Sequence, residues 1–149
     1  ASTANLIVAQ RLVRKICPNC IQSYKLDQQT ILELKQQLDL ENIMGTLEKK
    51  KIIADAKSGI ETLLFYRGKG CKQCSNSGYK GRIGIYEALE VTDEMSDLIL
   101  KKSPPPELLK QAERQGMLTM VEDGFIKAKN GITTIEEIMR VSKESISNY

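Results

Sequence analysis

The chain has no histidine and no tryptophan among its 149 residues, and these absences exclude several kinds of active site. Without histidine there is no Ser-His-Asp triad, no Cys-His nucleophile and no His-x-x-x-His metal site. A Gly-x-x-x-x-Gly-Lys-Ser/Thr phosphate loop is also missing, and the nearest glycine-rich string, Gly68-Lys69-Gly70, lacks the third glycine of a dinucleotide fingerprint. No apolar run approaches the roughly 20 residues that cross a bilayer. The sequence therefore predicts a soluble, cytoplasmic chain that runs no reaction alone.

The four cysteines are the most specific feature that is present. They form two Cys-x-x-Cys pairs, Cys17/Cys20 and Cys71/Cys74, and 50 residues separate the pairs. A Cys-x-x-Cys turn lets two thiolates reach one metal ion, and two such turns supply the four soft ligands of a closed tetrahedral zinc site. The spacing thus predicts a structural zinc ion that joins the two ends of a long excursion of the chain.

Three other interpretations of the cysteines compete with zinc. Disulfides require an oxidising compartment, and no secretory signal opens the sequence. A thioredoxin-like redox pair would explain one Cys-x-x-Cys and leave the other without a role. Four unrelated buried thiols would rarely fall into two such pairs. The spacing favours zinc over each of them.

Positive charge gathers around both cysteine pairs. Residues 1–25 carry a net charge of +4 and residues 67–82 carry +5, with no acidic residue in either segment, while the whole chain has +3. Four thiolates carry more negative charge than one zinc ion neutralises, so nearby cations should help to keep them deprotonated.

The first half of the chain is predicted to form two helices and two strands. Apolar residues over 4–16 fall on one helical face, and Asp27 should cap a second helix over 28–40. The polar stretch 41–58 predicts a solvated helix or a mobile loop. Two strands are expected, over 61–66 and 82–91, and their pairing would bring the two cysteine turns together.

Four further helices are expected after Thr92, which begins the first of them. Ser103 with its following prolines begins the second, and capping boxes at Thr119 and Thr134 begin the third and fourth. Their apolar residues should form one small core, made of Leu108, Leu109, Ala112, Met117, Val121, Phe125, Ile126, Ile135, Ile138, Met139 and Val141.

The predicted fold is mainly α with a small β element. A zinc-clipped lobe of two short strands plus a helix is followed by a cluster of four C-terminal helices. The boundaries are residues 1–16 for the first helix, 17–91 for the tetracysteine zinc lobe with its insertion, 92–141 for the helical domain and 142–149 for a frayed tail.

Three strings of the sequence occur in order in one known family. They are Ala9-Gln10-Arg11-Leu12-Val13-Arg14-Lys15 with Cys17-Pro18-x-Cys20, Tyr66-Arg67-Gly68-Lys69-Gly70-Cys71-x-x-Cys74 with Gly78-Tyr79-x-Gly81-Arg82-Ile83-Gly84-Ile85-Tyr86-Glu87, and Glu122-Asp123-Gly124 with Gly131-Ile132-Thr133-Thr134-Ile135-Glu136-Glu137. Together they resemble the carboxy-terminal region of the type II secretion and type IV pilus assembly ATPases, the GspE/PilB kind.

The resemblance implies a hexameric cytoplasmic motor at the inner membrane, which hydrolyses ATP to drive pilin or pseudopilin assembly. Its members have a RecA-like core, a tetracysteine zinc insertion and a helical end, and the four cysteines here match the zinc ligands. The phosphate loop and the other ATP- and Mg²⁺-binding motifs of the family precede the segment that this chain resembles. The chain would then be a non-catalytic fragment, with residues 1–16 as the end of the ATPase core. Its partners would be that core, neighbouring subunits, and the platform or adaptor proteins of the machine.

The resemblance also suggests weaker sites on the first segment. Gln10 and Arg11, together with Arg82, would approach the nucleotide or an adjacent subunit in the whole motor. The alternative is that these three residues are a solvated surface and cations near the thiolates, as surface arginines commonly are.

Two functions outside the motor remain as alternatives. The basic lobe could bind nucleic acid, with Tyr24, Tyr66 and Tyr79 stacking on bases. The string Cys71-x-x-Cys74-x-Asn76-x-Gly78 approaches the repeat of DnaJ-type chaperones, but those proteins carry four repeats and this chain has cysteines for one site only.

Overall fold

The structure, a computed structural model, describes residues 4–146, which form four strands and six α-helices. The strands are β1 (Leu6–Ile16), β2 (Ile21–Lys25), β3 (Leu64–Gly68) and β4 (Tyr79–Glu90). The helices are α1 (Gln28–Gln37), α2 (Leu40–Lys49), α3 (Asp93–Leu100), α4 (Pro105–Arg114), α5 (Met120–Lys129) and α6 (Ile135–Ile146). Short 3-10 turns lie at Ala56–Ser58, Ile60–Thr62 and Lys72–Cys74.

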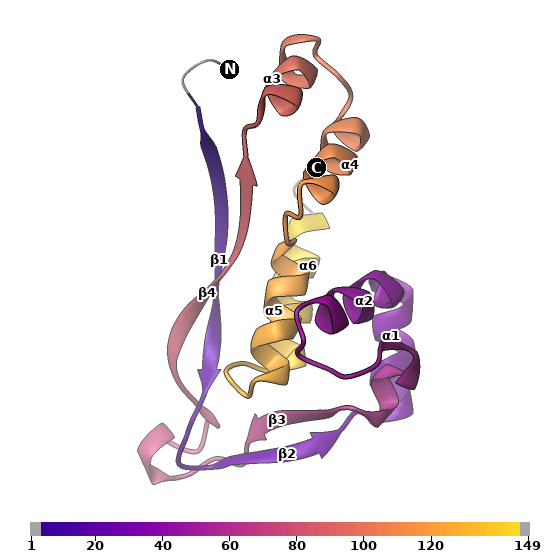
Figure 1. The fold of residues 1–149 in the computed structure, drawn as a ribbon. Coiled ribbons are helices and arrows are strands. Elements are labelled where there is room, and N and C mark those ends of the chain that lie inside the picture. The colour runs from indigo at the N-terminus through magenta and orange to yellow at the C-terminus, as the bar shows by residue number, and fades with distance from the viewer. Residues whose placement is uncertain (1–3, 147–149) are drawn as a thin grey trace.

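Two antiparallel ladders set the architecture. β1 pairs with β4, from Leu6 opposite Glu90 to Ile16 opposite Tyr79, and β2 pairs with β3. The long ladder stands upright in Figure 1 and the short one runs across its foot, with α5 and α6 in the angle between them. The expectation that the strands over 61–66 and 82–91 pair with each other was wrong, because each pairs with a strand from the first 25 residues.

The segment 4–16 is a strand, and the helix predicted there was wrong. Its 11 residues include β-branched Ile7, Val8, Val13 and Ile16, which pack well on a pleated surface. The antiparallel partner β4 supplies hydrogen bonds to the main chain of β1, whereas a helix would form its hydrogen bonds within the segment itself. This pairing with a distant segment decides the conformation.

The insertion between the cysteine pairs contains two capped helices. The Asp27 carboxylate accepts from Thr30 N at 2.8 Å as predicted, but α1 ends at Gln37 and Asp39 begins α2. α2 buries Ile43, Met44 and Leu47, which share one helical face. Residues 40–49 are therefore a packed helix, although the sequence predicted a solvated helix or a mobile loop over 41–58.

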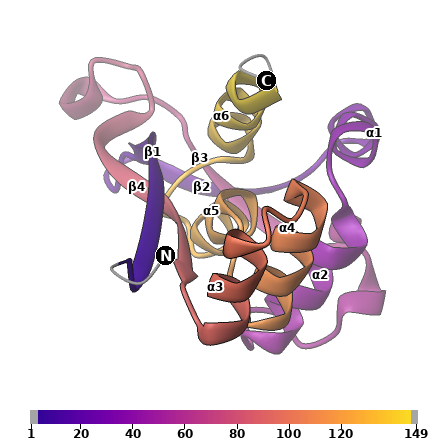
Figure 2. The ribbon, with the colours of Figure 1, turned by 90° about the horizontal axis from the view of Figure 1, so that it is seen from above.

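The main core joins this insertion to the C-terminal helices. Phe65 of β3, Leu34 of α1 and Leu47 of α2 pack with Phe125 of α5 and Ile138 of α6, and all five side chains are buried. α3 and α4 contact each other and form a hairpin after the end of β4, and the view from above in Figure 2 shows them next to each other. The four C-terminal helices exist, but the single four-helix core predicted for them was wrong.

The fold class is therefore mixed. Helices make up 47% and strands 24% of the structure, so the prediction of a mainly α fold was wrong. The predicted tail 142–149 is in part the end of α6, which continues to Ile146, and residues 147–149 lie outside the described part. None of the described helices is both long and apolar enough to cross a membrane.

Candidate metal centre

The four cysteine sulfurs converge where the two ladders meet. The Sγ–Sγ distances are 3.8 Å for Cys17–Cys71, 3.9 Å for Cys20–Cys74 and 3.6 Å for Cys71–Cys74, and all four sulfurs lie within 4.8 Å of one another. A tetrahedron with Zn–S bonds of about 2.3 Å has sulfur–sulfur edges of about 3.8 Å. Three of the six sulfur pairs thus stand at the spacing that one zinc ion requires, and the other three lie within 4.8 Å.

Backbone contacts hold the two cysteine turns together. Cys17 N donates to Gly78 O at 2.9 Å, and Lys69 N donates to Cys20 O at 2.9 Å. The main chains of Gly68 and Gly78 approach so closely that a Cβ on Gly68 would lie 2.1 Å from Gly78 O. The glycines are needed here because any side chain would push the two turns, and with them the sulfurs, apart.

Cys74 is the cysteine whose thiolate form the surrounding groups favour most. Cys71 N and Gly78 N donate to its sulfur at 3.2 and 3.3 Å. Burial opposes its ionisation, but these amides and the neighbouring thiols lower the pKa of Cys74 to about 6. Burial raises the pKa of Cys20 to about 12, and the other three thiols add to this rise although a Gly70 main-chain contact opposes it. The main-chain amides thus favour the thiolate form at Cys74.

The donor set fits a structural zinc ion. Soft thiolates are the ligands that zinc prefers, and four protein ligands leave no open position for a reactive water. The disulfide interpretation loses support, because all four cysteines are free and the sulfurs stand far beyond the bonded distance of about 2.05 Å. The residues that would hold the metal are Cys17, Cys20, Cys71 and Cys74, and the ion would supply a cross-link and no reaction chemistry.

The tyrosines around the centre are covered by arginines. The Arg14 guanidinium lies 4.1 Å from the Tyr79 ring centroid, and the Arg67 guanidinium lies 4.7 Å from that of Tyr24. One face of each of these rings thus already has a partner within the protein, which weakens the nucleic-acid alternative at two of its three aromatic residues.

The three weaker site residues do not form one cluster. Gln10 and Arg11 are neighbours on β1 and point to opposite faces of the ladder. Arg11 Nη1 donates to Val141 O of α6 at 3.2 Å, which gives this side chain a structural contact. Gln10 and Arg82 are exposed, and Arg82 lies opposite Arg14, four residues along β1 from Gln10.

A buried carboxylate beside the centre was not found by sequence reasoning. Glu137 of α6 is 1% exposed and binds Arg14 Nη2 at 2.8 Å and Arg140 Nη2 at 3.0 Å. Burial opposes its ionisation, but the two guanidinium groups and Arg14 N lower the pKa of Glu137 to about 2. The sequence predicted a capping box at Thr134; Glu137 N does donate to its hydroxyl, but the Glu137 carboxylate turns to β1. The signal available was the Thr-Thr-Ile-Glu-Glu string, which the sequence analysis used as a helix start and as part of the family resemblance, but not to predict a buried carboxylate.

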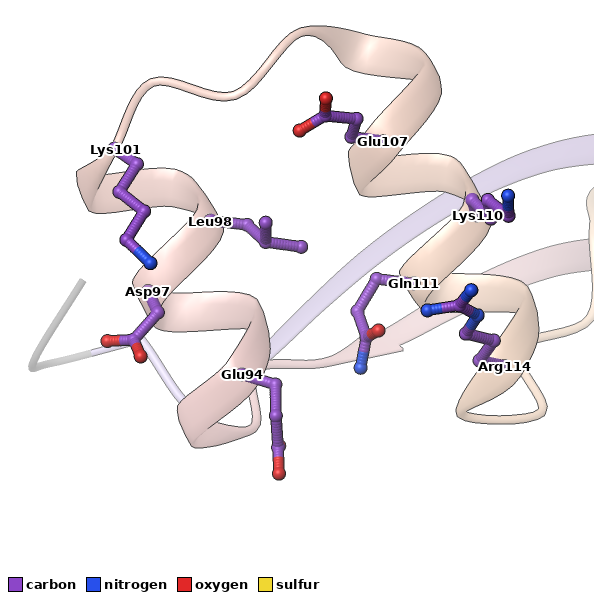
Figure 3. Close-up of a pocket in the computed structure, with 8 residues that line it drawn as sticks. All are labelled: Glu94, Asp97, Leu98, Lys101, Glu107, Lys110, Gln111 and Arg114. Atoms are coloured by element: carbon purple, nitrogen blue, oxygen red, sulfur yellow. The ribbon is translucent and has the colours of Figure 1, made fainter.

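The groove between α3 and α4 is a separate feature (Figure 3). It has a volume of about 380 Å³, and none of the four cysteines lines it. Both walls carry charges of both signs: Glu94, Asp97 and Lys101 line the groove from the α3 side, and Glu107, Lys110 and Arg114 line it from α4. Its open, charged walls lack the apolar lining of a small-molecule site.

Comparison with known proteins identifies relatives along nearly the whole chain. A family model described as "Type II/IV secretion system protein" matches residues 1–140. The type IV pilus assembly ATPase PilB of Pseudomonas aeruginosa is 35% identical over 97% of this chain, which is 22% of that protein. The type II secretion system ATPase E of Vibrio cholerae is 35% identical over 93% of the chain and 23% of its own length. PilB of Thermus thermophilus is 36% identical over 89% of the chain and 13% of its own length. The chain thus spans less than a quarter of each of these relatives.

Proposed function

The chain belongs to the type II/IV secretion system protein family, and from this we propose that it is a non-catalytic, zinc-binding carboxy-terminal part of a secretion or pilus assembly ATPase. One observation carries the proposal: the alignment covers 97% of the chain but 22% of a relative named as such an ATPase. The absence of a phosphate loop from these 149 residues supports it, because ATP hydrolysis then has to be performed by another part of the protein.

The proposed role of zinc is to fix the crossing of the two ladders. ATP and Mg²⁺ would bind elsewhere in the parent protein, a cytoplasmic hexamer that acts at the inner membrane through platform or adaptor proteins. Movement driven by ATP hydrolysis would pass through a rigid crossing to those partners. Three sulfur pairs, Cys17–Cys71, Cys20–Cys74 and Cys71–Cys74, are 3.6–3.9 Å apart, and this spacing supports the role because it suits a closed site that stabilises the fold.

The outer end of the β1–β4 ladder supports an attachment to a larger body. Leu6, Ile7 and Val8 are 58%, 49% and 54% exposed, and they alternate between the two faces of the ribbon. A two-stranded ribbon with both faces apolar and exposed is at best marginally stable in water. We place the ATPase core against this end. Gln10, further along β1, and Arg82, near the foot of the ladder, are both exposed, and we propose them as contacts to the core, its nucleotide or a neighbouring subunit.

Two experiments test the proposal. The coding sequence upstream of residue 1 should encode a Gly-x-x-x-x-Gly-Lys-Ser/Thr loop in the same reading frame, roughly one domain length away; an in-frame stop codon close to residue 1 would overturn the assignment. The purified 149-residue chain should contain one zinc ion and hydrolyse no ATP. Measurable hydrolysis that survives further purification would contradict the non-catalytic role.

A further inference from the structure

The long ladder contains an irregularity three residues before the first cysteine. Its register shifts between Arg14 and Ile16: Lys15 of β1 lies opposite two residues of β4, Lys80 and Gly81, so the extra residue of this bulge belongs to β4. A bulge bends its strand and leaves main-chain groups outside the regular ladder pattern. Here it lies directly after the segment that follows Cys74, and opposite the β1 residues that lead to Cys17.

The residues at the start of α6 bind the main chain of β1 opposite this bulge. Arg14 N donates to Glu137 Oε2 at 2.8 Å, and the Thr133 hydroxyl donates to Arg14 O at 2.8 Å. Two residues further along β1, Ile16 N donates to Ile132 O at 2.9 Å. The segment 132–137 thus satisfies the β1 backbone on both sides of Lys15.

The same segment also contacts the strand that leaves the second cysteine pair. The Tyr79 hydroxyl and the Thr134 hydroxyl are 3.1 Å apart, and the Tyr79 ring covers the Arg14 guanidinium. Tyr79 follows Gly78, whose amide donates to Cys74 Sγ and whose carbonyl accepts from Cys17 N. The start of α6 therefore holds one arm leading to Cys17 and one arm leading from Cys74.

The polar side chains that link α6 to β1 are buried. Thr133 is 0% exposed and Glu137 is 1% exposed, so a substitution that removes one partner leaves the other buried without its hydrogen bond. The buried hydrogen bonds between this segment and β1 lie around Lys15, two residues before Cys17.

We infer that the segment 132–137 is a positioning element of the metal centre: it holds β1 on both sides of Lys15, opposite the bulge of β4, and thereby directs Cys17 toward the other three sulfurs. Metal binding and the docking of α6 on β1 then stabilise each other by the same factor, because coupling between two equilibria is reciprocal. This inference depends on the metal site proposed above. It adds residues that bind no metal themselves.

The matched variants Thr133→Val and Thr46→Val test the inference. Both threonines are buried, and each donates one hydrogen bond. Thr133 donates to Arg14 O of β1, next to Lys15, whereas Thr46 donates to Glu122 Oε1 and does not bind β1. In the 149-residue chain, Thr133→Val should weaken zinc affinity about 10-fold, as loss of a partner outside the ligand shell commonly does. Thr46→Val should bind zinc as tightly as the unchanged chain. Tyr79→Phe, which loses only the hydroxyl contact to Thr134, is a milder second variant expected to act in the same direction.

Two further readouts separate positioning from general loss of stability. With Co²⁺ bound in place of zinc, the thiolate-to-metal absorption bands should change in Thr133→Val and stay unchanged in Thr46→Val. Removal of zinc from the unchanged chain should speed amide exchange in residues 135–142 of α6 by about the same factor of 10 while leaving α4 unaffected. Equal zinc affinities in all variants, with α6 protected after metal removal, would overturn the inference. If the unchanged chain binds no metal, the proposed site itself fails.

Discussion

Protonation of Glu137 gives the sharpest quantitative prediction about this fold. Its carboxylate is 1% exposed, while the Arg14 and Arg140 side chains that bind it are 50% and 45% exposed. The pKa of Glu137 falls from 4.5 to about 2 in the folded chain, and each pKa unit corresponds to about 1.36 kcal/mol. The shift alone would give about 3 kcal/mol of folding free energy at neutral pH. Solvent screening of the half-exposed arginines reduces this, so we expect Glu137→Gln to cost about 2–3 kcal/mol.

The sign of the pH dependence follows from the lowered pKa. Above the unfolded value of about 4.5 the carboxylate is ionised in both states, and the arginine pairs contribute in full. As the pH falls toward the folded value of about 2, the unfolded chain takes up the proton first and the contribution disappears. The difference in stability between the unchanged chain and Glu137→Gln should therefore shrink to about 1 kcal/mol near pH 3.

Urea unfolding, followed by far-UV circular dichroism from about pH 7 to about pH 3, measures this difference. Glu136→Gln is the control, because it removes the same charge from the same turn of α6 at an exposed position. Its stability difference from the unchanged chain should be small and nearly independent of pH. A Glu137→Gln difference that stays constant over this range would refute the assignment of a buried, ionised carboxylate between two arginines.

Four further substitutions test the core, two glycines and the sulfurs. Phe125→Ala should cost about 3–5 kcal/mol and speed amide exchange in β3 and α2 but not in α4, because the fully buried ring lies in the shared core; exchange confined to α3–α6 would contradict this. Gly78→Ala should cost about 1–3 kcal/mol in urea unfolding and lower the zinc content, since Gly78 has φ +78° and a Cβ would lie 2.6 Å from Gly68 O. Gly45→Ala, where α2 leaves open space, should instead add about 0.5–1 kcal/mol. Cys20→Ala should bind less than one zinc ion per chain in elemental analysis, and full retention would show that the metal is held elsewhere.

The features predicted correctly from the sequence are those that short segments determine. A Cys-x-x-Cys turn and a helix cap each depend on residues within a few positions of one another, so their meaning survives without knowledge of the fold. Asp27, Thr92 and Thr119 accept the hydrogen bonds expected of N-caps, and the four sulfurs meet. The ligand role of the cysteines remains a prediction, since their convergence is a necessary condition for metal binding and not a demonstration of it.

The strand β1 was mistaken for a helix because its outer half lacks the period of two that identifies strands. Leu6, Ile7 and Val8 are consecutive apolar residues that cover both faces of the ribbon, so apolar and polar residues do not alternate there. Further along, Leu12 is 49% exposed and Val13 is 0% exposed, so the two faces differ in burial although both residues are apolar. Pairing with β4, more than 60 residues away, cannot be deduced from local pattern. The high content of β-branched residues was the signal that favoured a strand.

The insertion shows a different kind of failure. Ile43, Met44 and Leu47 have the spacing of a buried helical face. Because several lysines follow them, the whole stretch was predicted to be a solvated helix or a mobile loop. Their partner Phe125 lies on α5, nearly 80 residues later, and the sequence assigned it to a separate helical core. A helix with one apolar face predicts that something covers it, and the three-dimensional structure was needed to show what.

The position of the cysteines at the foot of the two ladders has a physical reason. The β2–β3 ladder has five residues in each strand, and a two-stranded ladder of this length does not hold its own geometry in water. The core behind β3 fixes its far end, while at the near end both strands reverse into the cysteine turns, where few apolar side chains are available. A metal ion held by all four sulfurs supplies the missing constraint there. If movement in the parent motor passes through this crossing, the part that most needs rigidity is the one where a hydrophobic core cannot provide it.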